Sequence, residues 1–160
     1  TDFMGRQLNF QYDSAGRLVA AVLPSINSAA PGNTFPNGTA YVFQYDVNNT
    51  DPNRQNDLIN IYYPNQTLAY INSSRVVDVT SVYASATPRY TITYGQGSTN
   101  PDYGMVLTET VGDPANGIGG TYSFAYSTSN LPTNIIRPRR PDCQPNHRHR
   151  PQRQPGGLQL

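Results

Sequence analysis

The stretch LNFQYD at residues 8–13 recurs as YVFQYD at residues 41–46, and this repetition decides what fold the chain can adopt. In both copies apolar or aromatic side chains alternate with polar ones, which is typical of a β-strand with one buried face. Weaker copies of the same pattern end at Tyr70, Tyr94 and Tyr126. The sequence therefore predicts a series of similar strands, each ending in tyrosine.

The strand-ending tyrosines recur at a nearly regular spacing. They are Tyr12, Tyr45, Tyr70, Tyr94 and Tyr126, and the intervals between them are 33, 25, 24 and 32 residues. A period of roughly 25 residues with insertions is typical of repeat proteins, in which each unit packs on its neighbours. We expect these tyrosines to form aromatic ladders between units, where each aromatic pair adds ~0.5–1.5 kcal/mol beyond burial.

Each strand is followed by turn residues and a second strand, so one unit is predicted to be a β-hairpin. In the first unit DSAG at residues 13–16 forms the turn, and the return strand of residues 17–23 ends at Pro24. The third unit is expected to return through residues 75–80 and the fifth through residues 133–136. With 14 Pro and 13 Gly along the chain, long helices are not expected. We predict an all-β fold of about five antiparallel hairpins that form a curved sheet.

Two regions of unlike charge divide the chain. Residues 1–136 carry five arginines and nine acidic residues, whereas residues 137–160 carry six arginines and one acidic residue. The C-terminal region is rich in Pro and holds few large apolar side chains, so it cannot bury enough surface to offset its ordering entropy. We expect hairpin repeats over residues 1–138 and a disordered Arg/Pro-rich tail over residues 139–160.

The origin of the tail has a second interpretation. The change of composition near residue 137 is abrupt and falls at a repeat boundary, as a shifted reading frame would produce. Five hairpins alone would also leave open sheet edges, which are sites for further pairing. On both grounds we expect the chain to be a piece of a longer protein.

Candidate catalytic residues are scarce in the body of the chain. Residues 1–136 contain no histidine, so a Ser-His dyad is not available there. The carboxylates of Asp78, Glu109 and Asp113 are candidates for a catalytic pair, but nothing in their spacing pairs them. We therefore predict that the protein is not an enzyme.

The sequence also offers little for metals, nucleic acids or membranes. His147 and His149, with the single cysteine Cys143, fall short of the four ligands of a structural zinc site. The net charge of −4 over residues 1–136 does not attract nucleic acid, so only the tail could bind phosphates. The chain has no run of 18 apolar residues and shows no signal peptide. We expect no cofactor, no metal and no membrane span.

The hairpin phrases resemble the RHS/YD repeats of bacterial Rhs polymorphic toxins and of teneurins. The matching phrases, within residues 5–138, are GR (5–6), FQYD (10–13), GRL (16–18), VLP (22–24), NGT (37–39) and FQYD (43–46). The resemblance implies hairpins that wind into a hollow cocoon, which in bacterial members can enclose a toxic C-terminal domain. It implies a non-catalytic wall segment of a large bacterial secreted or cell-surface protein, with other repeats and an enclosed effector as partners.

Glycan binding is the alternative class of function. Exposed tyrosines on a twisted sheet can stack on sugar rings and hydrogen-bond through their hydroxyls. Tyr62, Tyr63, Tyr83 and Tyr103 fall outside the strand-ending positions and are the candidates. The competing interpretation is that these rings pack between successive hairpins.

Overall fold

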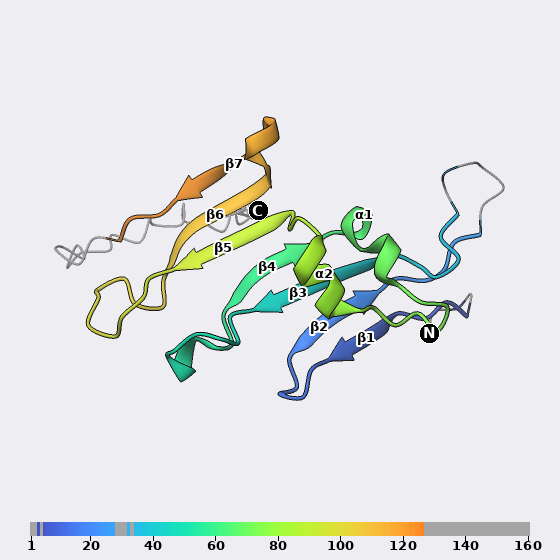
Figure 1. The fold of residues 1–160 in the computed structure, drawn as a ribbon, viewed down its shortest axis with the longest axis horizontal. Coiled ribbons are helices and arrows are strands. Elements are labelled where there is room, and N and C mark those ends of the chain that lie inside the picture. The colour runs from blue at the N-terminus through green and yellow to red at the C-terminus, as the bar shows by residue number, and fades with distance from the viewer. Residues whose placement is uncertain (1–2, 4, 28–31, 33, 127–160) are drawn as a thin grey trace, which may run out of the picture. The chain divides into compact units, whose positions relative to one another are not determined.

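Seven strands form one antiparallel sheet in which each strand pairs with the next one in the sequence (Figure 1). They are β1 (Asn9–Tyr12), β2 (Leu18–Val22), β3 (Ala40–Tyr45), β4 (Leu58–Tyr62), β5 (Tyr90–Tyr94), β6 (Val106–Asp113) and β7 (Ile118–Ser123). The prediction of a mainly β fold built from successive antiparallel strands is confirmed. The sheet is not closed, so β1 and β7 are its two edges.

The computed structural model describes residues 3, 5–27, 32 and 34–126. The return strand expected at residues 133–136 and the tail expected at residues 139–160 lie outside this range. All of the elements named here belong to the unit Thr1–Tyr126.

Three β-hairpins account for the first six strands: β1–β2, β3–β4 and β5–β6. β7 continues the sheet after the short 3-10 helix η3 (Pro114–Asn116) and pairs with β6 over its whole length. Gly112 and Gly119 face each other in this pair. A Cβ at Gly119 would lie 1.9 Å from the carbonyl oxygen of Val111, so the close approach of β6 and β7 requires glycine there.

The hairpin predicted around Tyr70 is wrong, because this part of the chain is mostly helical. It contains α1 (Pro64–Thr67), η2 (Leu68–Tyr70) and α2 (Val79–Ser85). Proline begins α1 without losing a hydrogen bond, and the Asp78 carboxylate caps α2 by accepting from the Ser81 amide. Of that hairpin only the turn and one antiparallel bridge exist: the amide of Arg75 donates to the carbonyl of Asn72, and Ile71 pairs with Val77. We call residues 64–86 the helical segment.

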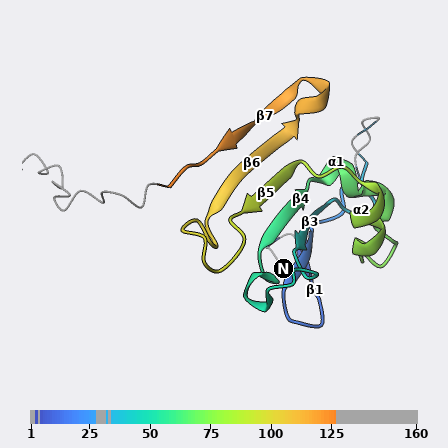
Figure 2. The same cartoon turned by 60° about the vertical axis from the view of Figure 1, so that its left-hand side comes forward.

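Hydrogen bonds from side chains hold the helical segment on one face of the sheet (Figure 2). Gln11 of β1 exchanges two hydrogen bonds with the backbone of Val77, at 2.7 and 3.2 Å. The fully buried Thr67 hydroxyl donates to the carbonyl of Ala40 in β3 at 2.7 Å. The guanidinium of Arg75 donates to the carbonyls of Gln7 and Leu23. These bonds fix the segment across β1, β2 and β3.

The hydrophobic core lies between the helical segment and the sheet. Its buried residues are Ala20, Val22, Ala40, Val42, Tyr62, Ile71, Val77 and Val82. Farther along the same face, the cross-strand register brings hydroxyl side chains together on β5, β6 and β7. Thr93 bonds Thr108 at 2.6 Å and Thr110 bonds Thr121 at 2.8 Å. The apolar core therefore ends where this polar part of the face begins.

Val82→Ala should lower the free energy of unfolding by about 2 kcal/mol, because it removes buried methyl groups and leaves a cavity. Val82 is fully buried in the core of the helical segment. Val76→Ala is the matched control, since Val76 is 45% exposed in the same segment. Urea denaturation of both variants checks the prediction, and equal losses would contradict this location of the core.

Candidate functional site

A β-bulge lies at the same place in each of the three hairpins. In each hairpin, two consecutive residues pair with return-strand residues that are two positions apart. The two consecutive residues are the strand-ending tyrosine and the residue before it. The extra residues are Val19 in β2, Ile59 in β4 and Leu107 in β6. A bulge disrupts the ladder locally, and the first residue of each return strand, which pairs with the tyrosine, lies on the far side of it.

The pairing between neighbouring hairpins stops before it reaches these first residues. β2 pairs with β3 only from Ala20 to Val22, and β4 pairs with β5 only at Asn60 and Ile61. The first two residues of β2 and of β4 thus have no ladder partner in the following hairpin. Backbone carbonyls at such positions need another hydrogen-bond donor or water.

A tyrosine hydroxyl supplies that donor at both of these boundaries and again where the chain after β7 meets the third hairpin. Tyr45 donates to Leu18 at 3.0 Å, Tyr94 to Leu58 at 2.9 Å and Tyr126 to Val106 at 2.8 Å. Every acceptor is the carbonyl of the first residue of the preceding return strand. We call this contact between neighbouring hairpins the tyrosine junction.

Two of these phenols hold their protons more tightly than an ordinary tyrosine. Burial raises the pKa of Tyr45 and of Tyr94 above the ordinary value for tyrosine, and nearby carboxylates, Asp13 and Asp57 respectively, add to the effect. Both hydroxyls therefore stay protonated at neutral pH and donate to a carbonyl. The expected aromatic ladder is wrong in its contacts. Tyr45, Tyr94 and Tyr126 are joined to neighbouring strands by their hydroxyls, and the ring pairs among the described residues involve other tyrosines.

An arginine of the preceding hairpin stacks on the ring at the first junction. The guanidinium carbon of Arg17 lies 5.6 Å from the ring centre of Tyr45. Its Nε donates to the carboxylate of Asp13 at 2.7 Å, and its Nη1 donates to the carbonyl of Gln55 at 2.8 Å. Arg17 thus joins its own turn to both the ring and the loop of the next hairpin.

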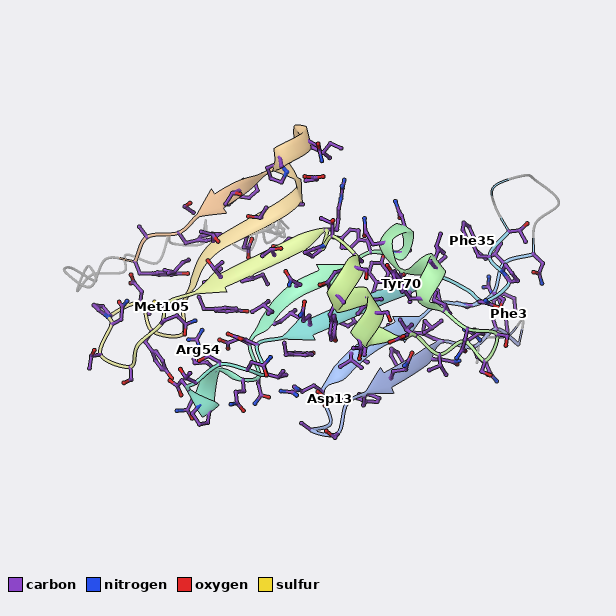
Figure 3. All side chains as sticks on the ribbon, in the orientation of Figure 1. Phe3, Asp13, Phe35, Arg54, Tyr70 and Met105 are labelled. Carbon is purple, nitrogen blue, oxygen red and sulfur yellow. The ribbon has the colours of Figure 1, made fainter. Side chains whose placement is uncertain are left out.

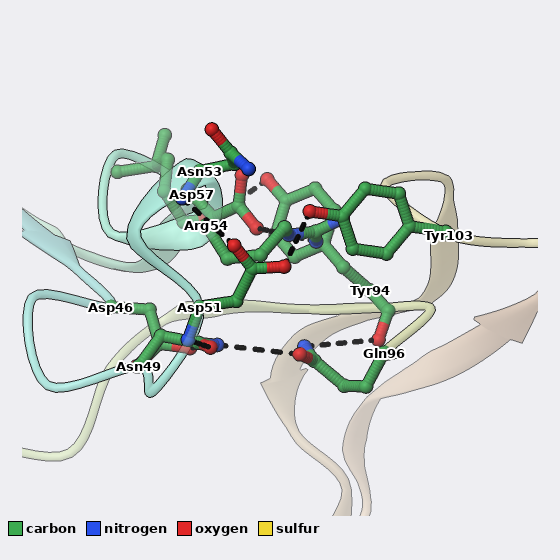
Figure 4. Close-up of polar contacts among 10 residues, drawn as sticks. Asp46, Asn49, Asp51, Asn53, Arg54, Asp57, Tyr94, Gln96 and Tyr103 are labelled. Atoms are coloured by element: carbon green, nitrogen blue, oxygen red, sulfur yellow. Dashed lines mark hydrogen bonds and ion pairs between the residues drawn. The ribbon is translucent and has the colours of Figure 1, made fainter. Parts of the chain in front are cut away.

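The second junction repeats this arrangement with a more deeply buried arginine (Figure 4). Arg54, which is 2% exposed, lies 5.1 Å from the ring centre of Tyr94 and 5.2 Å from that of Tyr103. Its Nε donates to Asp57 at 2.6 Å, while the Tyr103 hydroxyl donates to Asp51 at 2.5 Å. This last bond lowers the pKa of Asp51 and raises that of Tyr103.

Two of the predicted repeat tyrosines stand apart from the junctions. Tyr70 lies in the helical segment, away from the hairpin turns that carry Asp13 and Arg54 (Figure 3). Tyr12 ends β1 at the edge of the sheet, and its hydroxyl has no hydrogen bond with the part of the chain that the structure describes. Tyr126, by contrast, makes its junction from a position just after β7.

The four tyrosines proposed for glycan stacking do not form one platform. Tyr62 is 2% exposed, so no sugar can stack on its ring. Tyr83 packs against the core, where its hydroxyl donates to Phe43 at 2.7 Å. Tyr103 is stacked on Arg54. Tyr63 is the most accessible of the four at 38% exposure, and its ring meets Tyr41 edge-on at 5.5 Å.

The candidate catalytic carboxylates lie in separate local structures. Asp78 caps α2, Asp113 accepts from the side chain of Asn116 at 2.6 Å, and Glu109 lies opposite Tyr122 in the β6–β7 pair. Among the described residues, no group of three His, Cys, Asp or Glu could hold a metal ion. No helix in this part of the chain is long and apolar enough to cross a membrane.

Sequence reasoning found the tyrosines of the junctions but missed the arginines. Arg17 has a recognisable signal, because it directly precedes the return strand. Arg54 has none: it lies within a long loop whose 3-10 helix η1 (Pro52–Arg54) places it. Comparisons with protein-family models, with curated proteins and with solved structures find no match to this chain.

Arg54→Lys should lower the free energy of unfolding by about 2 kcal/mol, because an ammonium group loses the planar stacking between two rings while keeping the charge. Arg89→Lys is the control, since the Arg89 side chain makes no recorded ion pair or ring contact within the described residues. Guanidinium denaturation measures both variants. Equal losses would show that the stacked arginine does not stabilise the second junction.

Alkaline pH should destabilise the protein through Tyr83. Burial raises the pKa of Tyr83 to about 12, whereas an unfolded tyrosine titrates near ~10. The folded state therefore holds the proton more tightly, and its stability is complete below about pH 10 and falls as the pH rises toward 12. Unfolding free energies measured across this range should fall less steeply in Tyr83→Phe. The exposed-ring control Tyr63→Phe should follow the parent curve, and an unaltered slope in Tyr83→Phe would contradict the assignment.

Proposed function

We propose that this chain is a non-catalytic structural segment, made of successive hairpins, in the wall of an RHS-type shell of a large bacterial secreted or cell-surface protein. The observation that carries the proposal is the tyrosine junction, which recurs at both boundaries between the three described hairpins and again where Tyr126, just after β7, meets the third hairpin. A contact that repeats in the same geometry suits a scaffold assembled from like units.

Each junction involves only the two hairpins that meet there. The donor comes from one hairpin, and the carbonyl comes from the other. At the first two junctions the stacked arginine also comes from the preceding hairpin. Such nearest-neighbour contacts allow units to be added without changing those already present. A long wall could therefore be built by repeating this one contact between neighbouring hairpins.

The groups at the junctions are engaged with one another, which favours a structural role over a catalytic one. Tyr45 and Tyr94 are neutral donors to carbonyls, and Arg17 and Arg54 are paired with Asp13 and Asp57. None of these pairs has the nucleophile-and-base arrangement of covalent catalysis. In the proposed shell the partners are other repeats of the same or a parent chain, together with an enclosed effector domain.

Glycan binding has less support than the wall. Of the four candidate rings, Tyr62 and Tyr83 belong to the core region and Tyr103 is held by Arg54 and Asp51. Tyr63 alone does not make a binding platform. A protein whose tyrosines join neighbouring hairpins needs them held between those hairpins, as the half-buried Tyr45 and Tyr94 are.

Replacing Tyr45 or Tyr94 by phenylalanine tests the structural role. Each change keeps the ring and removes the hydroxyl, so the acceptor carbonyl loses its donor and the free energy of unfolding should fall by about 1 kcal/mol. Tyr12→Phe is the matched control, because it removes a hydroxyl that has no acceptor among the described residues. It should change stability by less than about 0.5 kcal/mol. Urea denaturation measures all three variants.

The wall proposal fails if the Tyr45 and Tyr94 variants are as stable as the Tyr12 control. Saturable binding of a defined sugar that is lost in Tyr63→Ala, with all three phenylalanine variants unaffected, would favour the glycan-binding alternative. A loss confined to Tyr45 and Tyr94 supports the tyrosine junction as the element that joins the units.

A further inference from the structure

The first strand presents the same residues as the third, but without a neighbour. β1 and β3 both end in the sequence FQY followed by aspartate, and both have the bulge beside their terminal tyrosine. Phe10 is 51% exposed and Tyr12 is 61% exposed, whereas Phe43 and Tyr45 are half-buried in the interior of the sheet. The difference arises because β3 has the return strand β2 beside it and β1 forms an edge.

The hydroxyl of Tyr12 is the unmatched half of a tyrosine junction. Its counterparts Tyr45 and Tyr94 donate to the first carbonyl of a preceding return strand. Within the described residues no return strand precedes β1, and the Tyr12 hydroxyl has no hydrogen-bond partner there. The missing acceptor therefore has a defined position, set by the two complete junctions.

The edge of β1 also lacks features that prevent pairing. Its residues, NFQY, include neither a charged side chain nor proline. Unprotected edges of this kind are templates for another strand. The bulge that could have twisted this edge away lies in β2, on the other side of β1, so the outward backbone groups of β1 remain in regular geometry.

We propose that the free edge of β1 binds the return strand of another hairpin of the same kind, antiparallel, with the Tyr12 hydroxyl donating to the carbonyl of that strand's first residue. An arginine shortly before that residue stacks on the Tyr12 ring, as Arg17 and Arg54 stack on Tyr45 and Tyr94. The inference rests on the proposed function and adds to it the partner, the direction and the register of the contact at this edge.

The arginine distinguishes this partner from an arbitrary β-strand. Arg17 directly precedes Leu18, and Arg54 lies four residues before Leu58, yet both guanidinium groups reach the ring of the following hairpin. The position of the arginine within the turn can therefore vary. The position of the first residue of the return strand cannot vary, because the tyrosine hydroxyl bonds its carbonyl. A strand without such an arginine should bind more weakly.

A synthetic peptide of residues 7–24 provides the probe, because it contains Arg17 and the return strand β2, the strand that pairs with β3 in the structure. The contact is short and a single hairpin is marginally stable, so the peptide is used at roughly millimolar concentration. In nitrogen-15-labelled full-length protein, we expect amide shift changes centred on β1 and slower hydrogen exchange at its outward amides. Contacts from the Tyr12 ring to the Arg17 side chain of the peptide should establish the register.

Matched variants distinguish the proposed contact from nonspecific binding of the peptide. Tyr12→Phe in the protein should weaken peptide binding about fivefold to tenfold, whereas Tyr63→Phe should leave it unchanged. In the peptide, Arg17→Gln should weaken binding severalfold. Ala21→Pro should abolish it, because the Ala21 amide faces the following hairpin, as does the amide of Leu23, which donates to Thr39 in the structure.

The proposal is overturned if the peptide leaves β1 unperturbed, if it binds elsewhere on the protein, or if Tyr12→Phe binds as tightly as the parent. Its failure is distinguishable from failure of the proposed function. If Tyr45→Phe and Tyr94→Phe lose stability but the peptide does not bind at β1, only this edge contact is rejected and the proposed structural function is retained. Stable Tyr45 and Tyr94 variants would reject the wall itself.

Discussion

The fold depends on how neighbouring hairpins stay together where their strands diverge. Ladder pairing between hairpins ends before the first residue of each return strand, so a carbonyl is left there without a strand partner. A tyrosine side chain spans the gap and donates its hydroxyl to that carbonyl. A bulge residue directly follows each acceptor in the return strand, so the bulge and the tyrosine contact recur together.

The helical segment completes the hydrophobic core by covering the apolar part of the sheet. Ile71, Val77 and Val82 supply the layer that β2 and β3 need to bury their alanine and valine side chains. Beyond β4 the same face carries threonines that bond one another across strands. That region needs no cover, which explains how a segment of about twenty residues suffices for a seven-stranded sheet.

Prediction from the sequence succeeded where alternating side chains marked a strand and failed where it relied on repeat spacing alone. The alternation in LNFQYD and YVFQYD correctly placed β1 and β3, and the DSAG turn after β1 was also placed correctly. At Tyr70 the spacing alone suggested a strand, but Pro64 and Asp78 favour helix starts and the core binds the resulting helices. Regular spacing was thus a weaker guide than capping residues.

For the tyrosines, the sequence predicts what neighbouring residues decide but not what distant residues decide. Alternation and turn chemistry within a dozen residues specify that the chain makes hairpins, because strand and turn preferences act between neighbours in sequence. They do not specify which carbonyl a phenol reaches. Tyr45 meets Leu18 across 27 residues, and Arg54 meets Tyr94 across 40, because the packing of one hairpin on the next brings them together. Tyr62 is buried and Tyr12 is exposed because different strands and helices pack around them in the folded protein. The local sequence does not specify which elements those are.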